Sequence, residues 1–250
     1  MMNIKKIEVN VSTYFFIILC LFSGFMFRLP YLLLIFLVHE LGHILFCFFF
    51  KVNILKLEIY PFGGVFQIDK DLNIEIYKDF LISFGGILFQ IIFFFINRFL
   101  LKNTTLEHYN LLFLSVNLLP IIPFDGSKLI LITLSKFISF YYSYIFYFFF
   151  SIFTDIILLI NHPFFSYNSL SIVIFSIYFI YKEIRDFPLI FNKFLMERFL
   201  NKYNLNKQIY INKNNLIYLR RGKECFFLVD SYENEYKLLS KKFDNSSYIW

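Results

Sequence analysis

Cysteine is scarce in this chain of 250 residues, which has only Cys20, Cys47 and Cys225. No two of them have the spacing of a metal-binding pair, and this argues against a disulfide framework and against zinc bound by thiolates. Charged residues are also few, at 17% of the chain. That share is low for a soluble globular protein, in which about a quarter of the residues are charged.

Apolar residues are abundant instead. Hydrophobic residues make up 58% of the chain, aromatic residues 23%, and phenylalanine alone occurs 39 times. A run of about 20 apolar residues is long enough to cross a bilayer as a helix. We therefore expect an all-α polytopic membrane protein with about six transmembrane helices. The apolar runs cover residues 12–28, 30–50, 79–101, 109–134, 138–160 and 164–181.

Basic residues predict the orientation in the membrane. The first run follows Lys5 and Lys6, but no small-x-small cleavage site follows it, so we expect this span to be retained. Loops on one side of the six spans hold only Arg28, Arg98 and Lys102, and the other side collects the remaining basic residues. The positive-inside rule then puts both termini in the cytoplasm. The net charge of +6 predicts contact with the lipid bilayer and requires no nucleic acid.

Two of the apolar runs carry polar motifs. The run at residues 30–50 contains His39-Glu40-Leu41-Gly42-His43, and the run at 109–134 contains Asn117-Leu118-Leu119-Pro120 and then Asp125-Gly126. An ionisable side chain near the middle of a membrane helix costs roughly 2.5 to 3.5 kcal/mol on insertion scales, so such residues usually mark a functional site. The two motifs therefore predict a polar site inside the membrane.

The first motif has the spacing of a metal site. His39 and His43 are four residues apart, so on a helix both imidazoles lie on one face and can bind one ion. Glu40 beside them is placed to act as a general base. The pattern also arises by chance in soluble chains, but the apolar surroundings and the second polar run favour a metal. Catalytic zinc normally has three protein ligands, so one ligand is missing.

Asp125 is the strongest candidate for this third ligand. A carboxylate binds zinc directly, and Pro120 and Pro123 interrupt the helix just before it. Alternatively, Asp125 caps the chain where it leaves the membrane, because Asp-Gly is an ordinary turn signal. Asn117 is a candidate hydrogen-bond donor to a substrate carbonyl. Its alternative role is a hydrogen bond between helices.

Residues 52–70 alternate apolar and polar side chains on both sides of Pro61-Phe62-Gly63-Gly64. This pattern predicts a membrane-associated β-hairpin. A protease cuts an extended backbone, and an exposed hairpin edge can hold one as an added strand. Pro61, Phe62, Gly63 and Gly64 are therefore candidate substrate-positioning residues. The alternative is an apolar connecting loop.

The chain from residue 182 onward has a different composition, with 13 of the 24 Lys and Arg residues. A helix is predicted from Pro188 to Tyr203, because apolar residues recur there at helical spacing. Two short strands are predicted at residues 215–219 and 225–230, on either side of Arg220-Arg221-Gly222-Lys223. We therefore expect two domains, a membrane domain over residues 1–181 and a small cytoplasmic α+β tail over residues 182–250.

The motifs together resemble the site-2 protease family of intramembrane zinc metalloproteases. Within the family they are similar to the members that release a sporulation sigma factor from its membrane-bound precursor. The resemblance covers about residues 12–204, including Phe194-Leu195-Met196-Glu197-Arg198. It implies one zinc ion per chain, held by His39, His43 and Asp125, with Glu40 as the base.

The resemblance also implies partners. These are a membrane-tethered pro-sigma factor as substrate and small inhibitory membrane proteins as regulators. The tail resembles about half of a CBS-type nucleotide-sensing module. Many relatives have Ala-Gly-Pro where this chain has Ser83-Phe84-Gly85-Gly86-Ile87-Leu88, and no segment here is long enough to be the PDZ domain that other relatives insert.

Two other functions remain open. The chain is alternatively a housekeeping or stress-response protease of this family, acting on anti-sigma factors or signal-peptide remnants. It is alternatively a non-catalytic scaffold or transporter that uses the polar residues to bind an ion or a partner helix. Glu40 separates these classes, because a site that only binds a metal does not require a base between its ligands.

Overall fold

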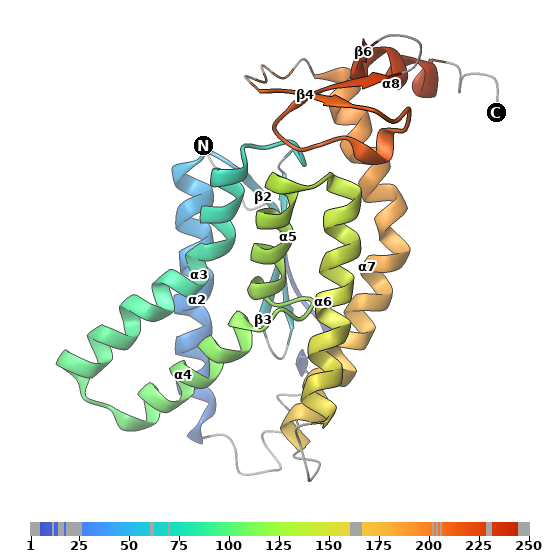
Figure 1. The fold of residues 1–250 in the computed structure, drawn as a ribbon. Coiled ribbons are helices and arrows are strands. Elements are labelled where there is room, and N and C mark those ends of the chain that lie inside the picture. The colour runs from blue at the N-terminus through green and yellow to red at the C-terminus, as the bar shows by residue number, and fades with distance from the viewer. Residues whose placement is uncertain are drawn as a thin grey trace. The chain divides into compact units, whose positions relative to one another are not determined.

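The structure of the protein is a computed structural model (Figure 1), which describes residues 6–11, 13–14, 18, 27–60, 63–69, 71–160, 167–201, 203, 205, 207–228 and 232–244. Contacts divide the chain into two compact units, one of residues 1–70 and 80–119 and one of residues 71–79 and 120–250. The elements are β1 (Lys6–Val9), α2 (Leu29–Phe49), β2 (Asn53–Tyr60), β3 (Gly63–Asp69), α3 (Ile76–Ile96), the π-helical turn η2 (Asn97–Leu101), α4 (Thr104–Leu118), α5 (Asp125–Phe137), α6 (Phe140–Ile160), α7 (Tyr167–Leu200), β4 (Gln208–Ile211), the 3-10 turn η3 (Leu216–Tyr218), β5 (Glu224–Leu228), β6 (Tyr232–Asn234) and α8 (Glu235–Phe243).

The long helices bury polar side chains and expose apolar ones, which is the reverse of a soluble protein. In α2, His39, Glu40 and His43 are buried, whereas Leu37 and Leu41 are about half exposed. A helix with this distribution is stable where its outer face meets lipid and its inner face meets protein. The burial pattern therefore agrees with a membrane protein.

Three segments of the described chain are long and apolar enough to cross a membrane, Leu29–Phe49, Ile76–Leu101 and Phe140–Ile160. They correspond to the second, third and fifth predicted spans. The fourth, residues 109–134, consists of the two shorter helices α4 and α5. Most of the first span and the beginning of the sixth lie outside the described residues, so the number six stays a prediction.

In the first unit, α2 and α3 cross closely at Gly42 and Gly85. A Cβ atom on Gly42 would clash with the Gly85 carbonyl group, and one on Gly85 would lie 2.7 Å from the Gly42 carbonyl oxygen. Any larger residue at either position would separate the two helices. Residues 83–88 form continuous α-helix, so the glycines found in place of Ala-Gly-Pro permit this close packing.

The predicted hairpin is present, as the antiparallel pair β2 and β3. Tyr60 pairs with Gly63 and Ile59 with Gly64, whereas Pro61 and Phe62 lie outside the described residues. Strand β1 was not predicted. It pairs in parallel with β2, with Lys6 opposite Lys56, and gives the order β1-β2-β3.

In the second unit, α6 packs along α7 (Figure 1). Phe140 stacks on Phe194 with a centroid distance of 4.1 Å, and Tyr144 stacks on Phe187 at 4.8 Å. The Ser176 hydroxyl donates to Asp155 at 2.6 Å between the same two helices. Asp155, the lone acid of this span, therefore takes part in helix packing.

The prediction that a helix begins at Pro188 is wrong. Helix α7 runs for 34 residues from Tyr167 to Leu200, with Pro188 inside it. Proline is tolerated within a helix when packing against neighbouring helices compensates for the lost backbone hydrogen bond. The neighbouring residue Phe187 stacks on α6 and supplies such packing.

The tail contains the three-stranded sheet β4-β5-β6 and helix α8. The predicted strand at residues 215–219 is wrong, because Asn215 accepts a hydrogen bond from the Ile217 amide at 3.0 Å and begins the turn η3. Asparagine side chains compete with strand pairing in this way. The first strand of the tail is β4, and the second prediction, residues 225–230, corresponds to β5.

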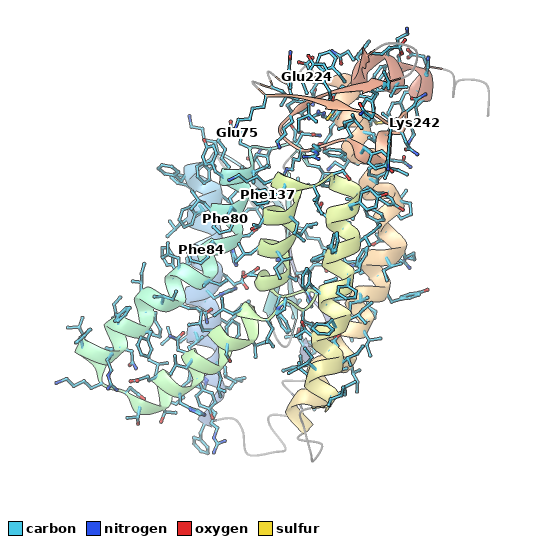
Figure 2. The ribbon with its side chains drawn as sticks, in the orientation of Figure 1. Glu75, Phe80, Phe84, Phe137, Glu224 and Lys242 are labelled. Atoms are coloured by element: carbon cyan, nitrogen blue, oxygen red, sulfur yellow. The ribbon has the colours of Figure 1, made fainter. Side chains whose placement is uncertain are left out.

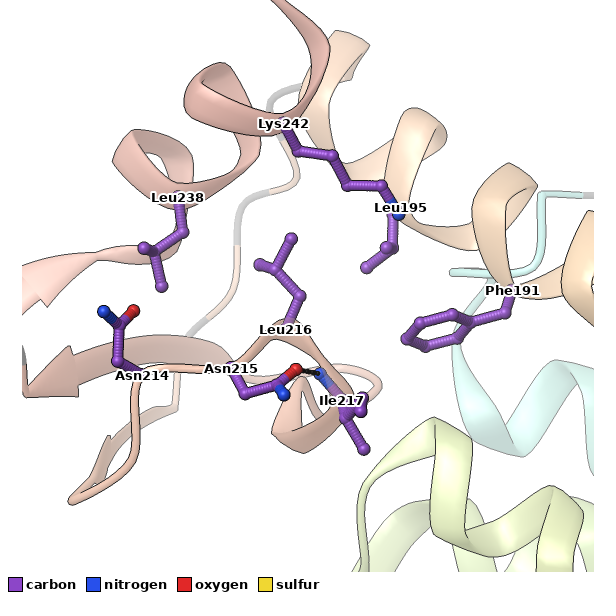
Figure 3. Close-up of a pocket in the computed structure, with 8 residues that line it drawn as sticks. All are labelled: Phe191, Leu195, Asn214, Asn215, Leu216, Ile217, Leu238 and Lys242. Atoms are coloured by element: carbon purple, nitrogen blue, oxygen red, sulfur yellow. Dashed lines mark hydrogen bonds between the residues drawn. The ribbon is translucent and has the colours of Figure 1, made fainter. Parts of the chain in front are cut away.

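A cavity of about 350 Å³ lies between α7, α8 and the turn η3 (Figure 3). Lys242 lies at this cavity and donates to Asn192 at 2.8 Å, and the Asn215 side chain caps η3. These two polar groups therefore hold the fold of the tail itself. The lining residues are Phe191, Leu195, Asn214, Asn215, Leu216, Ile217, Leu238 and Lys242.

The buried thiol of Cys225 provides a test of the tail fold. Burial raises its pKa to about 11, so at pH 8 only about one molecule in a thousand carries the thiolate. We expect N-ethylmaleimide to label Cys225 roughly 100-fold more slowly in the folded protein than in the denatured one at this pH. Mass spectrometry of the tail peptide measures the two rates. Equal rates would contradict the burial of this strand.

Candidate metal centre

Helix α2 brings two imidazoles together. His39 and His43 are buried, and their rings are nearly perpendicular with centroids 4.8 Å apart. Their Nε2 atoms are 3.2 Å apart. Glu40 follows His39 directly and is only 5% exposed. The predicted shared face of the helix is therefore present, with the carboxylate beside it.

Helix α3 fixes which nitrogen of each ring carries the proton. Nδ1 of His43 lies 2.8 Å from the Ile82 carbonyl oxygen, which only accepts hydrogen bonds, so this nitrogen donates. Nδ1 of His39 lies 3.0 Å from Oε1 of Gln90 and donates in the same way. In both neutral rings the lone pair is then on Nε2.

Two lone pairs that face each other across 3.2 Å repel. A cation that accepts both removes the repulsion, and histidine ligands of metals characteristically donate their other N–H group to a carbonyl or carboxylate. The donor set also suits zinc, which binds neutral imidazole. The histidine pair and its two acceptors therefore fit a metal ion.

Gly86 makes room for the imidazoles. A Cβ atom at this position would lie 2.5 Å from Cε1 of His39 and 2.5 Å from Nε2 of His43. Gly86 follows Ile82 by four residues and precedes Gln90 by four, so the three lie on one face of α3. This face supplies a carbonyl, a gap and an amide to the two rings.

Helix α4 completes the surroundings of His39 in the first unit. The Phe113 ring packs edge-on against His39 with centroids 5.5 Å apart, and Asn110 donates to the Gln90 backbone carbonyl at 3.0 Å. Asn117 is buried and follows Phe113 by four residues, so it shares this face of α4. Its role toward substrate stays a prediction.

In the second unit, Asp125 is the first residue of α5 and is buried. Residues 119–124 interrupt the helical structure before it, so their backbone groups need other partners. The Ser151 hydroxyl accepts from the Ile122 amide at 2.9 Å. Lys128 donates to Oδ1 of Asp125 at 3.1 Å. Asp125 therefore begins a helix, where the helix dipole favours a carboxylate.

Sequence reasoning missed several of these roles, among them those of Gln90, Lys128, Ile82 and Gly86. Gln90 left a signal, because it is an amide inside an apolar run. Lys128 was used only to predict the orientation, although its position three residues after Asp125 suits an ion pair. Ile82 contributes through its backbone carbonyl and Gly86 through an absent side chain, and no pattern of residue types reveals either role.

No protein-family model matches the chain. It is 36% identical over 142 residues to stage IV sporulation protein FB of Bacillus subtilis (strain 168), a match that covers 53% of this chain and 49% of the relative. The chain therefore spans about half the length of this relative. It also superposes on the Site-2 Protease from Methanocaldococcus jannaschii with a TM-score of 0.58, over 73% of this chain and 93% of that one.

The chain has the fold of a site-2 protease. The sequence identity to the solved structure is 21%, so that comparison establishes the fold alone. The identity to the sporulation protein adds a likeness in sequence. The resemblance to the site-2 protease family that the motifs predicted is therefore confirmed.

The hydrogen bond to Gln90 provides a test of the candidate metal centre. Replacing Gln90 by leucine keeps its size but removes the acceptor that orients His39, and we expect zinc affinity to fall by about 10- to 100-fold. Chelator competition with the purified protein measures this. Ile92→Leu, on an exposed part of α3, is the control and should leave affinity unchanged. Equal affinities for wild type and Gln90→Leu would show that this bond does not orient the ring.

Gly86 provides a second test. The substitution Gly86→Ala puts a methyl group into the space of both rings, so we expect a larger loss of zinc affinity than in Gln90→Leu. The same chelator competition measures it, with circular dichroism as a check that the helices are intact. A variant that binds zinc as wild type does would contradict the tight packing described.

Proposed function

We propose that this protein is an intramembrane zinc metalloendopeptidase that cleaves a membrane-tethered protein. The observation that carries the proposal is the oriented imidazole pair, with Nε2 atoms 3.2 Å apart and Glu40 beside it, on a helix apolar enough to cross a membrane. The likeness in fold to a site-2 protease and in sequence to a sporulation protein supports it.

We propose His39, His43 and Asp125 as the ligands of one zinc ion per chain. All three are buried, and each offers one ligand atom of a kind that zinc accepts. Lys128 interacts with one oxygen of Asp125, so it would help to orient this carboxylate. Both histidines are already in the tautomer that a ligand requires.

The residues around the ligands would carry the remaining steps. When bound, zinc polarises a carbonyl group and makes a water molecule more acidic. Glu40 would take the proton of the attacking water and deliver it to the leaving amine. Asn117 would donate a hydrogen bond to the substrate carbonyl, where negative charge develops. Helix α3 would keep both imidazoles in place throughout, because Ile82 and Gln90 hold their Nδ1 atoms.

The hairpin is the proposed holder of the substrate. A scissile bond must be in an extended segment, and strand addition to a sheet edge provides one. Strand β1 already occupies one side of β2, so in the order β1-β2-β3 the strand β3, with Gly63 and Gly64, lies at the end of the described sheet. We assign the substrate to this edge, near the predicted turn residues Pro61 and Phe62.

The most specific substrate that we propose is a pro-sigma factor with an N-terminal hydrophobic pro-segment. The resemblance of the motifs and the sporulation relative support this choice. The proposed topology has six spans, both termini in the cytoplasm, and small membrane proteins as inhibitors. The tail over residues 182–250 would then meet the cytoplasmic part of the substrate. A housekeeping or stress-response protease is the second reading, since it would use the same site.

The base provides the decisive test of function. Glu40→Gln removes the proton acceptor and leaves both histidines, so we expect unchanged zinc content and loss of cleavage by at least roughly 100-fold, the usual effect of removing a general base. The assay is co-expression with a membrane-tethered pro-sigma factor, followed on a gel, with zinc measured in the purified protein. The matched control is Glu75→Gln, because Glu75 is an exposed glutamate directly before α3 (Figure 2).

Each outcome has a separate meaning. Cleavage that survives Glu40→Gln would show that the proposed mechanism is wrong. Zinc in the wild-type protein without cleavage of any pro-sigma factor would reject this substrate and favour the housekeeping reading. A protein with no zinc at all would reject the metalloprotease.

A further inference from the structure

The beginning of α3 is held by the tail. Contacts group residues 71–79 with the second unit, which contains the tail, and not with the rest of this helix. Nη2 of Arg221 lies 2.7 Å from Oδ2 of Asp79, in the first turn of α3, and also donates to the Ile74 carbonyl at 3.0 Å. The two charged side chains are only 4% and 6% exposed. We call this set of contacts the α3 latch.

The turn that carries Arg221 is itself fixed. Gly222 has φ +69°, a left-handed conformation that glycine adopts without strain. Arg198 of α7 donates to the Lys223 carbonyl at 2.6 Å and pairs with Glu235 at 2.8 Å. Glu235 also accepts from the Cys225 amide at 2.9 Å. Hydrogen bonds from α7 and α8 therefore hold the turn that carries Arg221 in place.

The residues before Arg221 bind the ends of two further helices. The Leu219 carbonyl accepts from the Phe140 amide at 3.1 Å, at the start of α6. Arg220 donates to the Phe137 carbonyl at 2.9 Å, at the end of α5, where Figure 2 labels Phe137. Residues 219–221 thus contact the ends of α3, α5 and α6.

Helix α7 also forms hydrogen bonds with the segment just before α3. Oε2 of Glu197 accepts from the Leu72 amide at 2.7 Å and from the Asn73 side chain at 3.2 Å. Asn73 also donates to the Phe194 carbonyl at 3.2 Å. These contacts give a structural role to the Phe194-Leu195-Met196-Glu197-Arg198 stretch that the sequence analysis singled out.

Removing one partner of a buried ion pair leaves an uncompensated buried charge, so the pair disfavours arrangements in which Arg221 and Asp79 are apart. The residue that it holds, Asp79, is three positions before Ile82, whose carbonyl orients His43. Gly86 and Gln90 follow on the same continuous helix. Asp79 is therefore on the same continuous helix as the three residues that contact the two imidazoles.

We propose that Arg221 is a positioning residue for the metal site. By holding Asp79, it sets the placement of α3 and thereby the orientation of His39 and His43. The tail then has a structural role, through the start of α3, in addition to any contact with substrate. The link to the metal rests on the proposed function, whereas the link to α3 does not.

The test uses the full chain in detergent with four variants. Arg221→Met removes the charge, Arg221→Lys restores part of it, and Asp79→Asn weakens the same pair from the other side. Lys78→Met is the matched control, because Lys78 is the neighbour of Asp79 but forms an exposed ion pair with Glu75. Hydrogen exchange of residues 80–90 and the visible absorption of Co²⁺ bound in place of zinc are measured for each.

We expect Arg221→Met and Asp79→Asn to speed exchange in residues 80–90 by roughly 10-fold or more and to change the Co²⁺ spectrum, with Arg221→Lys intermediate. Lys78→Met should match wild type in both. Faster exchange confined to residues 207–228, or an equal effect of Lys78→Met, would overturn the proposal. If Arg221→Met does not fold, Asp79→Asn and Arg221→Lys decide by the same criteria. A wild-type protein that binds no Co²⁺ would reject the metal site, and exchange would still decide the latch.

Discussion

Two imidazoles whose Nε2 lone pairs face each other across 3.2 Å are the constraint on which the rest of this structure depends. Each ring gives its other N–H group to a fixed acceptor, an arrangement characteristic of histidines that bind a metal. Both acceptors come from α3, so α3 must approach α2 closely. The glycines at positions 42, 85 and 86 make this approach possible. The polar residues of the motif are buried on the inner face of α2, and its outer face is apolar.

Much of the site could be predicted because its signal is local. The spacing of His39 and His43 places them on one face of a helix. The prolines before Asp125 predicted the interruption that separates α4 from α5. Alternation around the Pro-Phe-Gly-Gly turn predicted the hairpin. The backbone carbonyl of Ile82 could not be predicted, since every residue has one and only the packed fold selects it.

The missed and wrongly predicted elements share a physical cause, because in each of them contacts within the folded chain override the local sequence pattern. Strand β1 is four residues long and pairs with a segment about 50 positions away, so no local pattern reveals it. Residues 215–219 are apolar enough for a strand, but the Asn215 side chain favours a turn. Pro188 ordinarily ends a helix, yet stacking of aromatic rings on α6 keeps α7 continuous. The latch joins positions 79 and 221, and its residues carry no signal in isolation.

The parallel pairing of β1 with β2 has a practical consequence for protein engineering. Strand β1 is the neighbour of β2 and lies two strands away from β3. At the usual spacing of a sheet, the distance from β1 to β3 is about 10 Å. An affinity tag or fluorescent protein fused directly before Lys6 therefore lies next to the sheet to which the substrate is assigned. Because β1 and β3 are opposite edges of the described sheet, such a fusion leaves the β3 edge, to which we assign the substrate, open to a peptide.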